Sequence, residues 1–221
     1  MMLMPIGNKG VIKQEGGVMH RRRRYWVQGG IDCLYDAENV AIDLFKRAKD
    51  YEVFLCLLSI CKVYFDFRII AYCLMPNCYH LIVEKENNPI IKAVKWLNHT
   101  YLCHFGKKKE SGIAFETCIY EMPQHDDNLM LCASRYIHMR PVLGGLVRRT
   151  IDYKYSSYNT LSGSIDDGIT DTSIILDRFF GNSDYYADFV NDACGTVEME
   201  NMVFKTNCII RGKINGLEDV I

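Results

Sequence analysis

The chain has 221 residues, of which 49% are hydrophobic, and a formal net charge of −1. This length suits one domain of about 130–160 residues with an appendage, and the apolar content is enough for a real core. The charge argues against a surface that binds nucleic acid everywhere, and no run of about 18 apolar residues predicts a membrane span. The ten cysteines form no Cys-x-x-Cys pair, so we expect mostly buried thiols in a cytoplasmic protein.

The first half of the chain predicts a strand, a helix and a hairpin after an aperiodic lead-in, residues 1–20. The first strand covers residues 25–28 and is expected to end at Gly29 and Gly30, whereas residues 32–49 give no clear pattern. Apolar residues at helical spacing indicate a helix over 50–63. The β-branched and aromatic stretches 67–74 and 78–84 flank Met75-Pro76-Asn77, which predicts two strands joined by a tight turn.

The second half predicts a helix from Pro89 to about 105, a strand over 113–121, and a helix that Asp126 caps and Pro141 stops near Met139. Short helical segments follow at 172–180 and 184–192. The order strand, helix, strand, strand, helix, strand indicates an α+β fold: a ferredoxin-like antiparallel sheet with helices on one face. We expect three regions: a flexible lead-in (1–20), the main domain (21–160), and a C-terminal helical extension and tail (161–221).

Cys78 and His80 are two residues apart on the second hairpin strand, so their side chains share one face, which we expect to be available for chemistry. Two such groups can share a metal ion, but a buried structural thiol and a hydrogen-bonded strand histidine are the plainer alternatives. Positive charge is clustered in three runs that could bind a phosphate backbone or simply be solvated. These runs are Arg21, Arg22, Arg23, Arg24, Lys107, Lys108, Lys109, Arg148 and Arg149.

Three stretches together resemble the single-tyrosine transposases of the HUH endonuclease superfamily, of the REP-associated and insertion-sequence types. They are AYCLMPNCYHLIVE (71–84), RYIHMRPVLGGLV (135–147) and DYKYSSYNTL (152–161). The resemblance implies DNA transposition on single-stranded or hairpin DNA, with Tyr136 as the nucleophile that forms a 5′-phosphotyrosine intermediate. Family members work as monomers or homodimers, so either state is open, and no membrane is involved.

The resemblance also implies a Mg²⁺ or Mn²⁺ site made of two histidines and an amide side chain four residues after the tyrosine. Here Cys78 replaces the first histidine, Arg140 occupies the amide position, and only His80 is retained. Thiolate is a poor ligand for Mg²⁺, whereas Arg140 can bind a phosphate directly through its planar fork. The sequence therefore leaves three alternatives: a nuclease that cleaves and rejoins DNA strands, a cleavage-deficient descendant that only binds DNA, or, with the least support, a metal-independent nucleotidyl enzyme that uses Arg140.

Overall fold

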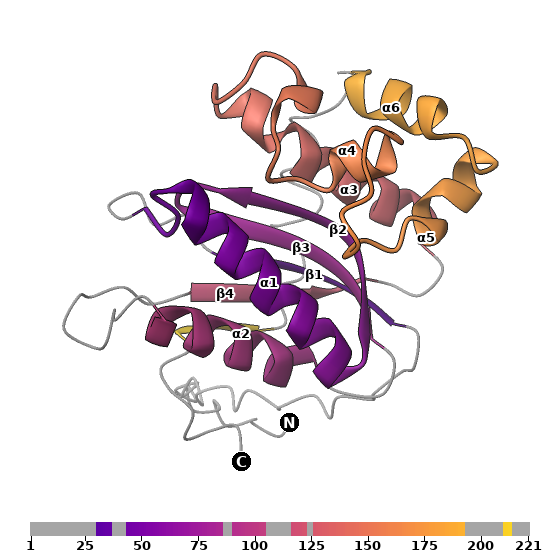
Figure 1. The fold of residues 1–221 in the computed structure, drawn as a ribbon. Coiled ribbons are helices and arrows are strands. Elements are labelled where there is room, and N and C mark those ends of the chain that lie inside the picture. The colour runs from indigo at the N-terminus through magenta and orange to yellow at the C-terminus, as the bar shows by residue number, and fades with distance from the viewer. Residues whose placement is uncertain are drawn as a thin grey trace, which may run out of the picture.

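One antiparallel sheet organises the protein, and its strand order is β2-β3-β1-β4-β5 (Figure 1). The computed structural model describes residues 30–36, 43–85, 90–104, 116–122, 126–192 and 210–213. The strands are β1 (Gly30–Asp36), β2 (Phe67–Met75), β3 (Cys78–Lys85), β4 (Glu116–Glu121) and β5 (Ile210–Lys213). The order of the first four strands and their alternation with helices confirm the predicted ferredoxin-like α+β plan.

Helices cover both faces of this sheet. Helix α1 (Ala48–Phe65) packs with α2 (Ile90–His104) on one face, and α3 (Asp127–Leu143) contacts β2 and β3 from the other (Figure 1). The smaller elements η2 (Thr150–Asp152), α4 (Tyr158–Leu161), α5 (Ser173–Leu176), η3 (Asp177–Phe179) and α6 (Ser183–Asn191) gather around α3. Because strand side chains alternate, neighbouring residues such as Leu81 and Ile82 belong to two separate core clusters, one under each helical layer. No helix among the described residues is long and apolar enough to cross a membrane.

The first described strand differs from the prediction. Gly30 begins β1 instead of ending a strand, and β1 lies largely in the stretch that gave no clear pattern; residues 25–28 lie outside the described residues. Local sequence hid β1 because glycine and aspartate are depleted in strands. Non-local pairing stabilises it: β1 pairs with both β3 and β4, and the buried Asp32 carboxylate accepts a hydrogen bond from Lys85 Nζ at 3.1 Å.

Two further boundaries differ from expectation. Helix α3 runs past Pro141 to Leu143, because proline removes a single donor and the helix is already in its last turn. The amides of Gly144 and Leu146 then donate to the carbonyls of Arg140 and Pro141, at 2.8 and 2.9 Å. In the tail, for which the sequence predicted no element, β5 pairs antiparallel with β4 and so returns to the sheet.

Irregular segments close the free edge of β2. The Leu74 amide donates to the Tyr155 carbonyl at 2.9 Å, and the Ser157 amide donates to the Tyr72 carbonyl at 3.0 Å. Further along the strand, the Asp171 amide donates to the Ile69 carbonyl at 2.7 Å. An exposed sheet edge is a site for unwanted strand pairing, so residues after α3 complete the sheet as well as covering α3.

A buried hydrogen-bond chain joins α3, α6 and the β2 edge through His138. Its Nδ1 lies 2.7 Å from the Tyr186 hydroxyl and its Nε2 lies 2.9 Å from Ser157 Oγ. Burial lowers the pKa of His138 to about 3, so the ring is neutral. The Tyr186 hydroxyl donates to Ser134 Oγ, hence Nδ1 carries the proton and Nε2 accepts from Ser157. His138 therefore has a structural role, buried and hydrogen-bonded at both ring nitrogens.

Replacing Ser157 with alanine tests the contribution of this hydrogen-bond chain to stability. The substitution leaves the Tyr72 amide, which donates to Ser157 Oγ at 2.8 Å, and His138 Nε2 without their buried partner. We expect the free energy of unfolding in urea to fall by about 1–3 kcal/mol. Ser164→Ala, at an exposed position, is the matched control and should change stability by less than about 0.5 kcal/mol. Equal stability of the two variants would contradict the role given to the chain.

Candidate functional site

The hairpin turn at Pro76 and Asn77 determines where Cys78 and His80 lie. With two turn residues, Cys78 pairs with Met75 and His80 pairs with Cys73 on β2, and His80 also pairs with Tyr35 on β1. Cys78 and His80 therefore lie at the hairpin end of β3, on the face of the sheet that α3 covers. This face was expected to be available for chemistry, but His80 is only 4% exposed and Cys78 is fully buried.

Helix α3 brings Tyr136 and Arg140 to the same place. The Tyr136 ring meets the His80 ring edge-on, with 6.3 Å between centroids and an angle of 90°. Arg140 is one helical turn further on, and its Cζ lies 5.6 Å from the centre of the Tyr136 ring. Cys78 Sγ is 3.8 Å from His80 Nε2. The structure thus places the four predicted residues in one cluster, which we call the Tyr136 cluster.

The imidazole of His80 is buried in the Tyr136 cluster and is itself neutral. Burial lowers the pKa of His80 to about 4, so the ring is uncharged near pH 7. A neutral imidazole has one N–H donor and one acceptor nitrogen, so it is chemically able to accept a proton or bind a soft metal ion. Tyr136 is itself only 5% exposed, which restricts the access of any phosphate to this tyrosine.

The side chains of the Tyr136 cluster do not fit Mg²⁺ or Mn²⁺. Both ions prefer oxygen ligands, and Mg²⁺ requires near-octahedral geometry, whereas Cys78 and His80 offer sulfur and nitrogen. Arg140 has no lone pair to donate. Across the described part of the chain, no group of three or more His, Cys, Asp or Glu residues is placed to hold a metal ion. The cluster as it stands therefore does not suit a hard divalent cation.

Basic side chains follow α3 directly. The loop after Gly144 turns back towards α3. The Oγ1 of the buried Thr150 lies 3.4 Å from Met139 Sδ on that helix. Arg148 is exposed on this loop, and Arg149 forms an ion pair with Asp152 at 2.6 Å. The predicted basic positions Arg21 to Arg24 and Lys107 to Lys109 lie outside the described residues. Of the basic positions predicted from the sequence, Arg140, Arg148 and Arg149 lie among the described residues.

Cys73 is the cross-strand partner of His80 and was not among the predicted site residues. The signal was present: a two-residue turn fixes the hairpin register, and counting back from Pro76 places Cys73 opposite His80. Burial raises the pKa of the Cys73 thiol well above its usual value. The thiol is therefore unreactive and forms part of the wall beneath the imidazole.

Comparisons with known proteins agree with this fold. No family model and no curated protein matches the chain. Among solved structures, a REP-associated tyrosine transposase bound to a REP hairpin has a TM-score of 0.54 and 18% sequence identity, with 70% of this chain and 90% of that chain covered. At this identity the similarity establishes a shared fold, in agreement with the α+β assignment.

The buried imidazole of His80 predicts a pH-dependent stability. Its pKa is near 6.5 when unfolded and about 4 when folded, so below pH 6.5 the unfolded state binds more protons, and stability falls towards pH 4. His80→Gln should therefore lose about 2 kcal/mol less stability than the wild type between pH 7 and pH 5. Urea unfolding at both pH values measures this, with the exposed His104→Gln as control. An unchanged pH dependence in His80→Gln would contradict the burial of a neutral ring.

Proposed function

We propose that the chain binds single-stranded or hairpin DNA as a protein of the single-tyrosine transposase type. The observation that supports this most is the convergence of Tyr136, His80 and Arg140 in one cluster, in a fold shared with a hairpin-bound transposase. Sequence motifs of one family had predicted these residues from separate parts of the chain. A chance combination of core residues would not be expected to reproduce that grouping.

DNA would be held mainly through arginine. Arg140 is half-buried beside Tyr136, and its guanidinium has the planar fork that matches two phosphate oxygens. Arg148 is exposed on the loop that follows the helix, so it can meet a phosphate of the same strand. Such contacts release counterions, and the affinity should therefore fall steeply with salt.

Neutralising these arginines tests the binding proposal. Arg140→Gln and Arg148→Gln should each weaken the binding of a labelled hairpin DNA several-fold and lower the slope of log K against log salt by about 1. Fluorescence anisotropy at 50–200 mM salt measures both quantities. Lys49→Gln, at an exposed position in the first turn of α1 on the other helical layer, is the charge-matched control. If all three variants behave alike, DNA does not bind at the Tyr136 cluster.

Strand cleavage through Tyr136 is the second candidate, because the tyrosine lies beside a neutral imidazole. In this reaction the Tyr136 phenolic oxygen would form a bond to phosphorus and the bond to the 3′ oxygen would break. The phenol proton would pass to a base such as His80, and the 3′ oxygen would leave with a proton. Rejoining would reverse these steps, with a 3′ hydroxyl attacking the phosphotyrosine.

The binding-only function has more support than cleavage. The tyrosine is 95% buried, and two family ligand positions hold a thiol and a guanidinium. Removing one electrostatic stabiliser of a transition state typically lowers the rate by about 10²–10³. A phosphate bound to Arg140 would gain charge stabilisation, but it would lack the short metal–oxygen contacts that activate it for attack.

A covalent-adduct assay separates the two candidates. We expect wild-type protein to bind hairpin DNA yet form little adduct on denaturing gels with Mg²⁺, Mn²⁺ or no metal. Cys78→His/Arg140→Asn should raise adduct formation about 10²-fold with Mg²⁺ or Mn²⁺, and adding Tyr136→Phe should abolish it. A strong wild-type adduct that needs Tyr136 would instead establish cleavage. An inactive double variant would show that more than the ligands has changed.

A further inference from the structure

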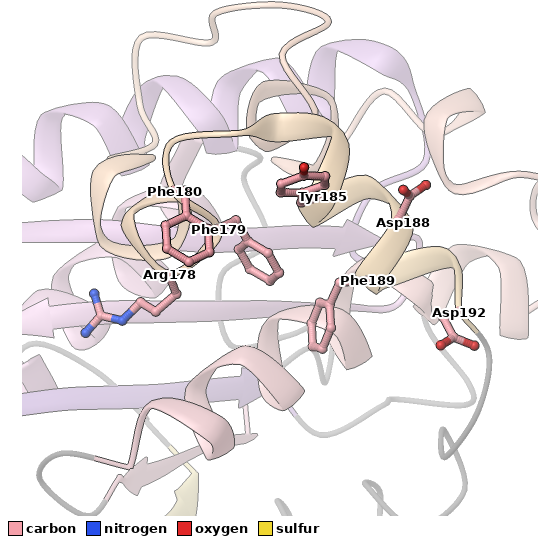
Figure 2. Close-up of a pocket in the computed structure, with 7 residues that line it drawn as sticks. All are labelled: Arg178, Phe179, Phe180, Tyr185, Asp188, Phe189 and Asp192. Carbon is pink, nitrogen blue, oxygen red and sulfur yellow. The ribbon is translucent and has the colours of Figure 1, made fainter.

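An open aromatic hollow lies on the C-terminal extension, outside the Tyr136 cluster. Its volume is about 410 Å³, within the roughly 300–1,000 Å³ of typical ligand pockets. Figure 2 shows the rings of Phe179, Phe180, Tyr185 and Phe189 around this space, drawn from η3, the turn after it, and α6. Two carboxylates of α6, Asp188 and Asp192, and the guanidinium of Arg178 complete the wall. We call this feature the α6 pocket.

The two sides of α6 explain why the pocket is outside the core. Tyr186 and Val190 point inward and are fully buried, which leaves Tyr185 and Phe189 on the pocket side of the helix. Phe179 packs against Phe189 with 5.4 Å between ring centroids, so the floor is preformed. Tyr185 is 56% exposed at the rim. A rigid floor with exposed rims is suited to receiving a side chain from outside.

Phe180 contributes nothing to the core that would explain its presence. It is 93% exposed, and its φ of 56° is in the left-handed region, which bulky residues rarely adopt. The turn ends η3, with the amides of Phe180 and Gly181 donating to the carbonyls of Asp177 and Leu176. Glycine or asparagine would serve this position better for folding. An exposed phenylalanine here is consistent with contact to a partner.

Charge determines which kind of partner fits. Residues 161–192 contain seven aspartates and one arginine, a net charge of −6, so the rest of the chain carries +5 within the total of −1. The single arginine, Arg178, is already bound to Asp127 at 2.8 Å and to the Ile174 carbonyl. Among the described residues, neither Asp188 nor Asp192 forms an ion pair. This surface repels a phosphate backbone and attracts cations.

The protein already contains a stacked arginine on Phe189, one of the rings of the pocket wall. Arg135 places its Cζ 4.5 Å from the centre of the Phe189 ring and donates to the backbone carbonyls of Phe189 and Asp192, both at 3.4 Å. A guanidinium therefore stacks well on this ring. The pocket face offers a similar aromatic surface together with two carboxylates, which favour a cation more strongly than carbonyls do.

We infer that the α6 pocket binds an arginine- or lysine-bearing segment of a partner protein. The cationic head group would stack on the exposed aromatic rings and pair with Asp188 or Asp192. Charge complementarity selects this occupant over DNA, and the open shape of the hollow suits a peptide segment passing over it. The interaction is independent of DNA binding at the Tyr136 cluster, because it uses the opposite charge.

Peptide binding to the full chain tests the inference. The basic probe is a fluorescein-labelled peptide with the sequence of residues 20–28, His-Arg-Arg-Arg-Arg-Tyr-Trp-Val-Gln. The control probe is the same peptide with glutamine in place of the four arginines. We expect only the basic probe to bind, and 0.5 M salt to weaken it. Phe180→Ala, Tyr185→Ala and Asp188→Asn/Asp192→Asn should each raise its Kd at least about tenfold.

Matched controls and competing occupants complete the experiment. Asp177→Asn/Asp184→Asn removes the same charge from the same region outside the pocket and should change Kd less than about twofold. The inference is overturned if neither probe binds, if both bind equally, or if the two aspartate pairs behave alike. It is also overturned if the pocket variants weaken hairpin DNA binding as much as peptide binding. Self-association that sedimentation detects and the pocket variants abolish would assign the surface to a second copy instead.

Discussion

The imidazole of His138 is buried between three separate parts of the chain, and its two hydrogen bonds set how they fit together. A neutral ring must donate from one nitrogen and accept at the other, so the chain of bonds runs in one direction from the Tyr72 amide to the Leu131 carbonyl. A shift of α3 or α6 would leave a buried polar group without a partner, which costs about 1–3 kcal/mol. Tyr136 lies on this same helix, so the geometry of its cluster depends on the His138 chain.

The same helix separates two surfaces of opposite charge. Arg140 and Arg148 are on α3 and the loop that follows it, whereas α6, packed against α3, belongs to a stretch with a net charge of −6. At physiological salt, charges interact over about 8 Å, so each surface keeps its own character although the total charge is near zero. A protein with a net charge near zero can therefore have one surface that attracts phosphate and another that attracts a cation. The net charge alone does not reveal this separation.

Local signals in the sequence were enough for the hairpin and α3. The Pro76-Asn77 turn and the Asp126 cap, whose carboxylate accepts the Leu129 amide at 2.9 Å, act within a few residues. By contrast, β1 depends on pairing with strands distant in sequence, and no local pattern reveals it. The grouping of Cys78, His80, Tyr136 and Arg140 followed from family motifs, but their burial did not, because α3 covers that face through tertiary packing.

Burial and charge together explain how the Tyr136 cluster can attract a phosphate without supporting strand cleavage. A guanidinium 5.6 Å from the Tyr136 ring attracts phosphate whether or not the tyrosine hydroxyl can reach phosphorus, because Coulomb attraction acts over several ångströms. Transfer of a phosphoryl group demands reacting atoms about 3–3.5 Å apart and charge stabilisation at the transition state. The guanidinium of Arg140 meets the looser requirement and leaves the stricter one unmet, so under the proposed function DNA affinity and strand cleavage would be separable properties of this cluster.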